Sequence, residues 1–73
     1  MPGVAKHRRI VGENIRQFRA RAEWSQEKLA ERAELHPTYI SDLECGKENV
    51  SLDSLASIAR ALKVKLYELV GDA

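Results

Sequence analysis

Residues 25–46, SQEKLAERAELHPTYISDLECG, decide the fold because they contain two short helical patterns with a brief break at residues 34–36. Each pattern is about two turns long, and isolated helices of that length are marginal in water. The second helix must therefore be held in place by the first helix and by the rest of the domain. This stretch predicts a short second helix that the first helix and the rest of the domain hold in place.

The first of the two patterns begins at a serine that is suited to start a helix. Ser25 is a good N-cap, because its hydroxyl can accept a hydrogen bond from a free backbone N–H of the first turn. Trp24 before this cap and Leu29 after it have the spacing of a hydrophobic staple. These signals predict a helix over 26–33.

The second pattern begins at a proline and ends before a glycine. Pro37 fits the first helical position, where its missing N–H costs nothing, and His36 is then the N-cap. Ile40 lies on the inward face, and Gly46 is suited to a left-handed residue after the helix end. A helix over 37–44 is predicted.

Apolar residues recur at intervals of three or four positions on both sides of this stretch. The stripes are Val11, Ile15, Phe18 and Ala22 on one side and Leu52, Leu55, Ile58, Ala59 and Leu62 on the other. They predict helices over 8–22 and 52–62, with Ser51 as the N-cap of the latter, and KLYELV supports a last helix over 66–70. Five helices without strand alternation predict a compact all-α bundle.

Length and composition fit one small helical domain, predicted over residues 8–73 after a flexible tail over 1–7. The chain has 73 residues, of which 44% are apolar and 32% charged. No apolar run approaches 18 residues, so we expect no membrane span and a cytoplasmic location. The single cysteine, Cys45, offers neither a disulfide nor a metal-binding set.

Charge is distributed unevenly along the chain. Residues 1–24 carry a net charge of +4 and residues 25–73 a net charge of −3. The basic end could face a polyanion, or it could be a solvated surface without a partner. Lys6, Arg8 and Arg9 could likewise reach along a DNA backbone or into a minor groove, or only solubilise the tail.

Four segments, in this order and spacing, carry a resemblance to a known family. They are IRQFR (15–19), SQEKLAERA (25–33), YISDLECGK (39–47) and SLDSLASIARALKV (51–64). Together they resemble the phage-repressor/Cro (XRE-like) helix-turn-helix domain over about residues 10–70. The resemblance implies the five-helix, lambda-repressor-like fold, whose third helix fits the major groove of DNA.

The resemblance implies roles for residues at and beside the helix pair. Base contacts are implied for Pro37, Thr38, Ser41 and Asp42. Phosphate contacts are expected from Arg16, which lies off the apolar stripe, and from Ser25, Gln26, His36, Tyr39, Lys47, Asn49 and Ser51. Arg19 and Glu44 would form a partly buried structural ion pair, and Ala30 would lie where the two helices cross.

Several of these positions depart from the family pattern or have a plainer explanation. Glu34 replaces the usual turn glycine, and a left-handed conformation there would cost about 1 kcal/mol. Pro37 cannot read a base by a hydrogen bond. Asp42 could accept from a cytosine amino group, pair with a neighbouring cation, or repel phosphate. Thr38 and Ser41 could contact bases or simply face solvent.

An apolar group near the end of the chain suggests a subunit contact. Leu66, Tyr67 and Val70 could be buried within the monomer, or they could form the interface of a homodimer. Within the family, the sequence looks most like the small controller proteins of restriction–modification systems and like stand-alone repressors. Both groups use the domain as a homodimer.

The expected function is that of a sequence-specific regulator that binds double-stranded DNA as a homodimer on a near-palindromic operator. RNA polymerase is a further candidate partner, whereas no cofactor, metal, membrane or small-molecule ligand is expected. The alternative is a protein-interaction module, antitoxin-like or an adaptor, that uses the same fold without specific DNA readout. An enzyme is not expected, because the sequence shows no nucleophile–base pair, phosphate-binding glycine loop or metal-binding set.

Overall fold

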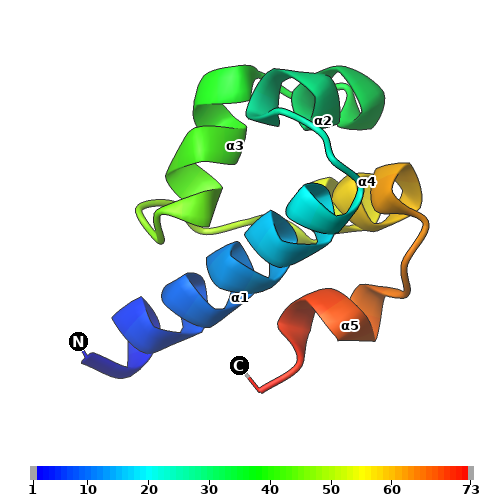
Figure 1. Ribbon diagram of the computed structural model, residues 1–73. Coiled ribbons are helices and arrows are strands. Elements are labelled where there is room, and N and C mark those ends of the chain that lie inside the picture. Colours follow the sequence, from blue (N-terminus) through cyan, green and yellow to red (C-terminus); the bar gives the residue numbers. More distant parts are fainter. Residues whose placement is uncertain (1, 73) are drawn as a thin grey trace.

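The computed structural model describes residues 2–72, and these residues form five α-helices and no strand. The helices are α1 (Pro2–Arg21), α2 (Gln26–Ala33), α3 (Pro37–Glu44), α4 (Leu52–Leu62) and α5 (Leu66–Val70). Figure 1 shows α1 running through the molecule, with α2 and α3 on one side of it and α5 on the other. The predicted all-α, five-helix fold is confirmed.

The last four helices have the predicted bounds, and capping explains where three of them begin. A side chain just before each helix accepts a hydrogen bond from a backbone N–H of the first turn, which leaves fewer unpaired donors. These pairs are Ser25 with Lys28 at 3.0 Å, His36 with Thr38 at 3.1 Å and Ser51 with Ser54 at 3.0 Å. The starts of these helices are therefore determined by local sequence.

The first helix is longer than predicted. It begins at Pro2 instead of residue 8 and ends at Arg21 instead of residue 22, so residues 2–7 are helical and do not form a loose tail. A proline in the first helical turn loses no hydrogen bond. The alanine, lysine and arginines that follow it are good helix formers.

A single core holds the five helices together. Its members are Ile15, Leu29, Ala30, Ala33, Ile40, Leu43, Leu55, Ile58, Ala59 and Leu69. Helix α1 packs against α3 and α5, while α2 packs against α3 and α4. Leu52 departs from the predicted stripe, because at the first position of α4 its side chain is 69% exposed.

Three of the helix ends use a left-handed residue that is not glycine. Glu23, Glu34 and Lys63 all have φ 60°, and the next residue donates its N–H to the carbonyl five positions earlier. This is the Schellman arrangement, in which an apolar residue after the left-handed one packs back on the helix. Those next residues are Trp24, Leu35 and Val64, and all three pack against the core. Core packing therefore holds a conformation that side chains rarely adopt.

Gly12 lies where α1 comes closest to α3. A Cβ atom at this position would lie 2.9 Å from the carbonyl oxygen of Glu44 and closer still to that of Leu43. Only glycine permits this approach, because both neighbours are backbone atoms that cannot rotate away. The end of α3 is thus fixed directly on the backbone of α1.

Candidate nucleic-acid interface

Helix α3 is anchored on one face and presents polar side chains on the other. Ile40 and Leu43 are buried in the core. Pro37 and Thr38 are exposed, and the side chains of Ser41 and Asp42, one turn further on, are half-buried. Residues three or four positions apart share a helix face. Ser41 has this spacing from both Pro37 and Thr38, and Asp42 has it from Thr38, so these four predicted base-contact residues lie on one side of α3.

Glu44, the last residue of α3, ties α3 to α1 and α2. Its carboxylate accepts from Arg19 Nε at 2.6 Å and Nη2 at 3.0 Å, and from Gln26 Nε2 at 3.0 Å. The side chains of Arg19 and Glu44 are 16% and 3% exposed. The hydrogen bond to Glu44 raises the pKa of Arg19 above its usual value, although burial opposes this shift. The ion pair implied by the family resemblance is present and is bidentate.

Gln26 and Arg16 keep hydrogen-bond donors available after making these contacts. The Gln26 amide has two N–H groups, of which Glu44 uses one. Arg16 donates to Glu13 at 2.7 Å, and both side chains are exposed. This hydrogen bond lowers the pKa of Glu13. The guanidinium has five donors, so Arg16 can contact an additional anion.

The loop between α3 and α4 is fastened to both α3 and α1. Tyr39 Oη lies 3.4 Å from the carbonyl oxygen of Asn49 and 3.4 Å from the backbone nitrogen of Ser51. Arg8 Nε donates to Asn49 Oδ1 at 3.1 Å. Tyr39, Asn49 and Ser51 therefore shape the loop, while the side chain of Lys47 is exposed in it.

Two other predicted phosphate contacts act as helix caps and remain exposed. Ser25 Oγ and His36 Nδ1 both accept backbone hydrogen bonds. The Ser25 hydroxyl hydrogen is still free to donate, and an imidazole that accepts at Nδ1 carries its hydrogen on Nε2. Capping is therefore compatible with a further contact to an oxygen.

The predicted subunit-contact residues remain outside the core. Tyr67 is 71% exposed, and Leu66 and Val70 are also exposed, whereas Leu69 between them is fully buried. The alternative that the monomer buries them is wrong. Asn14 Nδ2 donates to the carbonyl oxygens of Leu69 at 3.0 Å and Gly71 at 3.1 Å. Helix α5 is therefore fixed on α1, with Leu69 in the core and Leu66, Tyr67 and Val70 facing outward.

Sequence reasoning did not predict the observed structural roles of four residues. Gly12 sets the distance between α1 and α3, Arg8 holds the loop, Asn14 holds α5, and Leu52 is exposed. Contacts such as that of Arg8 with Asn49 join residues 41 positions apart and leave no local signal. Only Gly12 had a visible signal, since a glycine inside a helical pattern often marks close packing. Within residues 2–72, no helix is long and apolar enough to cross a membrane.

A short helix with an outward polar face, carried on a second short helix across a tight turn, defines a helix-turn-helix unit. Residues 15–69 match the family described as helix-turn-helix, and the chain belongs to this family.

Individual proteins of known sequence or structure are also similar to this chain. The chain is 47% identical over 64 residues to the control protein C.BamHI of Bacillus amyloliquefaciens, covering 86% of this chain and 79% of that protein. The crystal structure of the restriction-modification controller protein C.AhdI from Aeromonas hydrophila is similar, with a TM-score of 0.83 and 34% identity over 85% of this chain and 94% of that chain. The hypothetical transcription factor NHTF from Neisseria gives a TM-score of 0.85 and 38% identity over 88% of this chain and 74% of that chain.

Proposed function

We propose that this protein is a transcription regulator that binds a specific double-stranded DNA site as a homodimer, in the manner of a restriction–modification controller. The observation that carries the proposal is the division of α3 into a buried face and an exposed polar face, in a chain of the helix-turn-helix family. Such a helix fits the major groove of B-DNA. The similarity to C.BamHI and C.AhdI supports the controller role.

The exposed face of α3 supplies the base contacts in this proposal. The hydroxyls of Thr38 and Ser41 can donate to or accept from base edges, and Asp42 can accept from a cytosine amino group. Pro37 offers an apolar contact to a thymine methyl group. These four residues select the sequence.

Phosphate contacts position the helix and supply much of the affinity. Arg16, Gln26 and Lys47 keep free donors on exposed or half-buried side chains. Ser25, His36, Tyr39, Asn49 and Ser51 add neutral contacts around the same helix. Binding should therefore weaken as salt rises. The neutral polar residues should fix the position of α3 along the DNA.

A homodimer explains the exposed apolar side chains of α5. Leu66, Tyr67 and Val70 would meet their counterparts across a two-fold axis, so that each subunit uses the same patch. The two copies of α3 would then enter successive major grooves about 34 Å apart, on a near-palindromic site. RNA polymerase is the protein partner expected at a promoter.

The test is selection of bound sequences from a random duplex library at ~150 mM salt, followed by stoichiometry on the winning site. We expect a near-palindromic motif with half-sites about one helical turn apart, bound by two or four chains. The double change Thr38→Ala and Ser41→Ala should alter the selected bases, while Ser57→Ala in α4 should not. Binding without an enriched motif, fading uniformly with salt, would refute the proposal and favour the protein-interaction module.

A further inference from the structure

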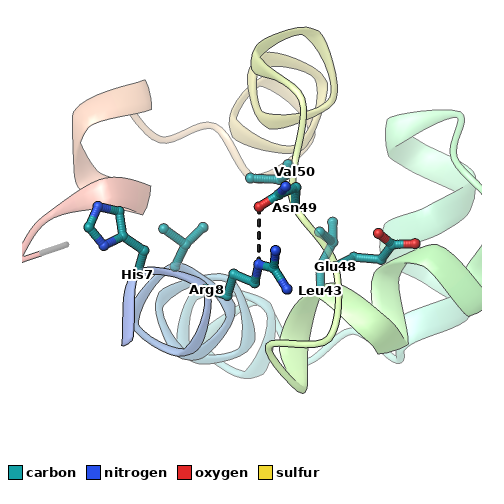
Figure 2. A pocket seen from close by; sticks show the side chains of 7 residues that line it. His7, Arg8, Leu43, Glu48, Asn49 and Val50 are labelled. Atoms are coloured by element: carbon teal, nitrogen blue, oxygen red, sulfur yellow. Dashed lines mark hydrogen bonds between the residues drawn. The ribbon is translucent and has the colours of Figure 1, made fainter. Parts of the chain in front are cut away.

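The N-terminal part of α1 lies along the loop that joins α3 to α4. Figure 2 shows Arg8 reaching from α1 to Asn49 across a small hollow, with a distance of 3.1 Å from Nε to Oδ1. The hollow has a volume of about 180 Å³ and is lined by His7, Arg8, Val11, Leu43, Glu48, Asn49 and Val50. Residues that are 41 positions apart in the chain thus form one surface.

Backbone packing fixes this part of α1 as well. A Cβ atom on Gly46 would lie 3.0 Å from Arg9 Cγ and 3.4 Å from Arg9 Cα, and the φ of Gly46 is +75°. One turn along α1, Gly12 lies against the carbonyl groups that end α3. The face of α1 that carries residues 8, 9 and 12 is therefore docked on the end of α3 and on the start of the loop.

This docking gathers positive charge beside α3. Lys6, Arg9 and Lys47 have exposed side chains, and Arg9 lies against Gly46, the residue before Lys47. Three acids lie near this group: Glu48 lines the hollow, and Glu13 and Asp72 line a second hollow together with Arg9. In the described part of the chain, the ion pairs within 4.0 Å join Arg16 to Glu13 and Arg19 to Glu44, and neither pair uses these lysines or Arg9. Among the described residues, no ion pair within 4.0 Å therefore neutralises Lys6, Arg9 or Lys47.

We propose that Lys6, Arg9 and Lys47 form a phosphate-binding ridge that extends the DNA contact from α3 along the sugar–phosphate backbone. The Arg8–Asn49 hydrogen bond holds the two halves of this ridge together. This inference rests on the proposed function, which supplies DNA as the ligand of the ridge. The structure favours duplex DNA as the ligand, because the loop that carries Lys47 directly follows α3, the helix proposed to contact the bases.

The ridge includes residues outside the part of the chain that matches the helix-turn-helix family. Lys6 and Arg9 lie outside residues 15–69, which match the family. Lys6 belongs to the part of α1 that extends beyond the predicted helix, because α1 begins at Pro2, whereas Arg9 already lies within the predicted range. The N-terminal part of α1 therefore extends the binding surface as a helix.

Salt dependence of DNA binding tests the ridge. The variant with Lys6→Gln and Arg9→Gln removes up to four phosphate contacts from a dimer, at roughly 0.9 in the slope of log Kobs against log salt for each. We expect the slope to become shallower by up to about 3.6, and binding at ~150 mM salt to weaken by roughly 10²–10³-fold. Lys47→Gln is the comparator within the loop, and Arg60→Gln on α4 is the matched charge control.

The titration is made on the selected site and on random duplex, so that the two proposals are separated. Loss of slope on both duplexes for Lys6→Gln with Arg9→Gln, but not for Arg60→Gln, supports the ridge even when no specific site exists. A slope equal to that of the unchanged protein overturns the ridge, and it leaves the proposed function intact when Lys47→Gln still loses slope. Equal thermal unfolding of all variants excludes misfolding as the cause.

Discussion

Replacing Gly12 with alanine adds one methyl group at the point where α1 lies against the end of α3. The new Cβ would lie less than 3.0 Å from two backbone carbonyl oxygens, those of Leu43 and Glu44. Neither oxygen can rotate away, so α1 and α3 must move apart. This movement would disturb both the core and the placement of α3.

Two opposing effects decide the size of the change. Alanine is favoured over glycine inside a helix by about 1 kcal/mol. Overpacking of a close contact costs about 1–3 kcal/mol, and the upper end applies because the clash is with backbone. The net loss for Gly12→Ala should be about 2 kcal/mol, which corresponds to a fall in Tm of about 8–16 °C for a domain of this size.

Thermal unfolding followed by circular dichroism measures this change. Two protein concentrations are needed, because the Tm of the proposed homodimer would depend on concentration. Gly71→Ala is the matched control, since its Cβ would lie 3.7 Å from the nearest atom. Its Tm should change little.

The opposite result has a clear meaning. If Gly12→Ala unfolds at the same or a higher temperature, helix propensity outweighs packing, and α1 and α3 are not in the close contact described here. A folded variant with unchanged DNA binding would also show that this contact does not position α3.

Three further changes test other parts of the structure. Glu44→Ala should lower the free energy of unfolding in urea by about 3 kcal/mol, because Arg19 keeps a largely buried charge without its partner; a loss below about 1 kcal/mol would contradict that role. Glu34→Gly should raise the free energy of unfolding by about 0.5–1 kcal/mol, because glycine adopts φ 60° without steric cost, and a lower stability would show that no strain is present. Arg16→Gln should raise the pKa of Glu13 towards its ordinary value in an NMR titration, since the Arg16 hydrogen bond lowers it. Because the folded pKa lies below the unfolded one, the stability from this pair is present above the unfolded pKa and is lost as pH falls through the folded pKa; an unmoved titration would refute the pair.

Helix bounds were predictable where the signals are local. Ser25, Pro37 and Ser51 each mark a start within one turn, and the structure places α2, α3 and α4 accordingly. The start of α1 was not predictable in this way. Pro2 with Gly3 is typical of a tail, and the contacts of Arg8 and Arg9 that hold the N-terminal half of α1 come from the distant loop.

The exposed face of α3 was also predictable, because burial of Ile40 and Leu43 fixes which side chains face outward. The side-chain pairs that hold α3 in place were not predictable from the spacing of the residues. The pairing of Arg19 with Glu44 came from the family resemblance, since residues 25 positions apart show no periodic relation. Leu52 shows the limit of periodicity, because a residue in the first turn of a helix can fit the stripe and still lie beyond the core.

The residues that secure α3 and the residues that it exposes form two separate sets. Ile40, Leu43 and Glu44 hold the helix, whereas the side chains of Thr38 and Ser41 form no hydrogen bond with any residue that the structure describes. Exposed positions can therefore be exchanged at little cost in stability. Relatives with this scaffold are free to diverge in the sites they recognise while keeping one fold, and an engineer could transplant the outer face of α3 as a cassette.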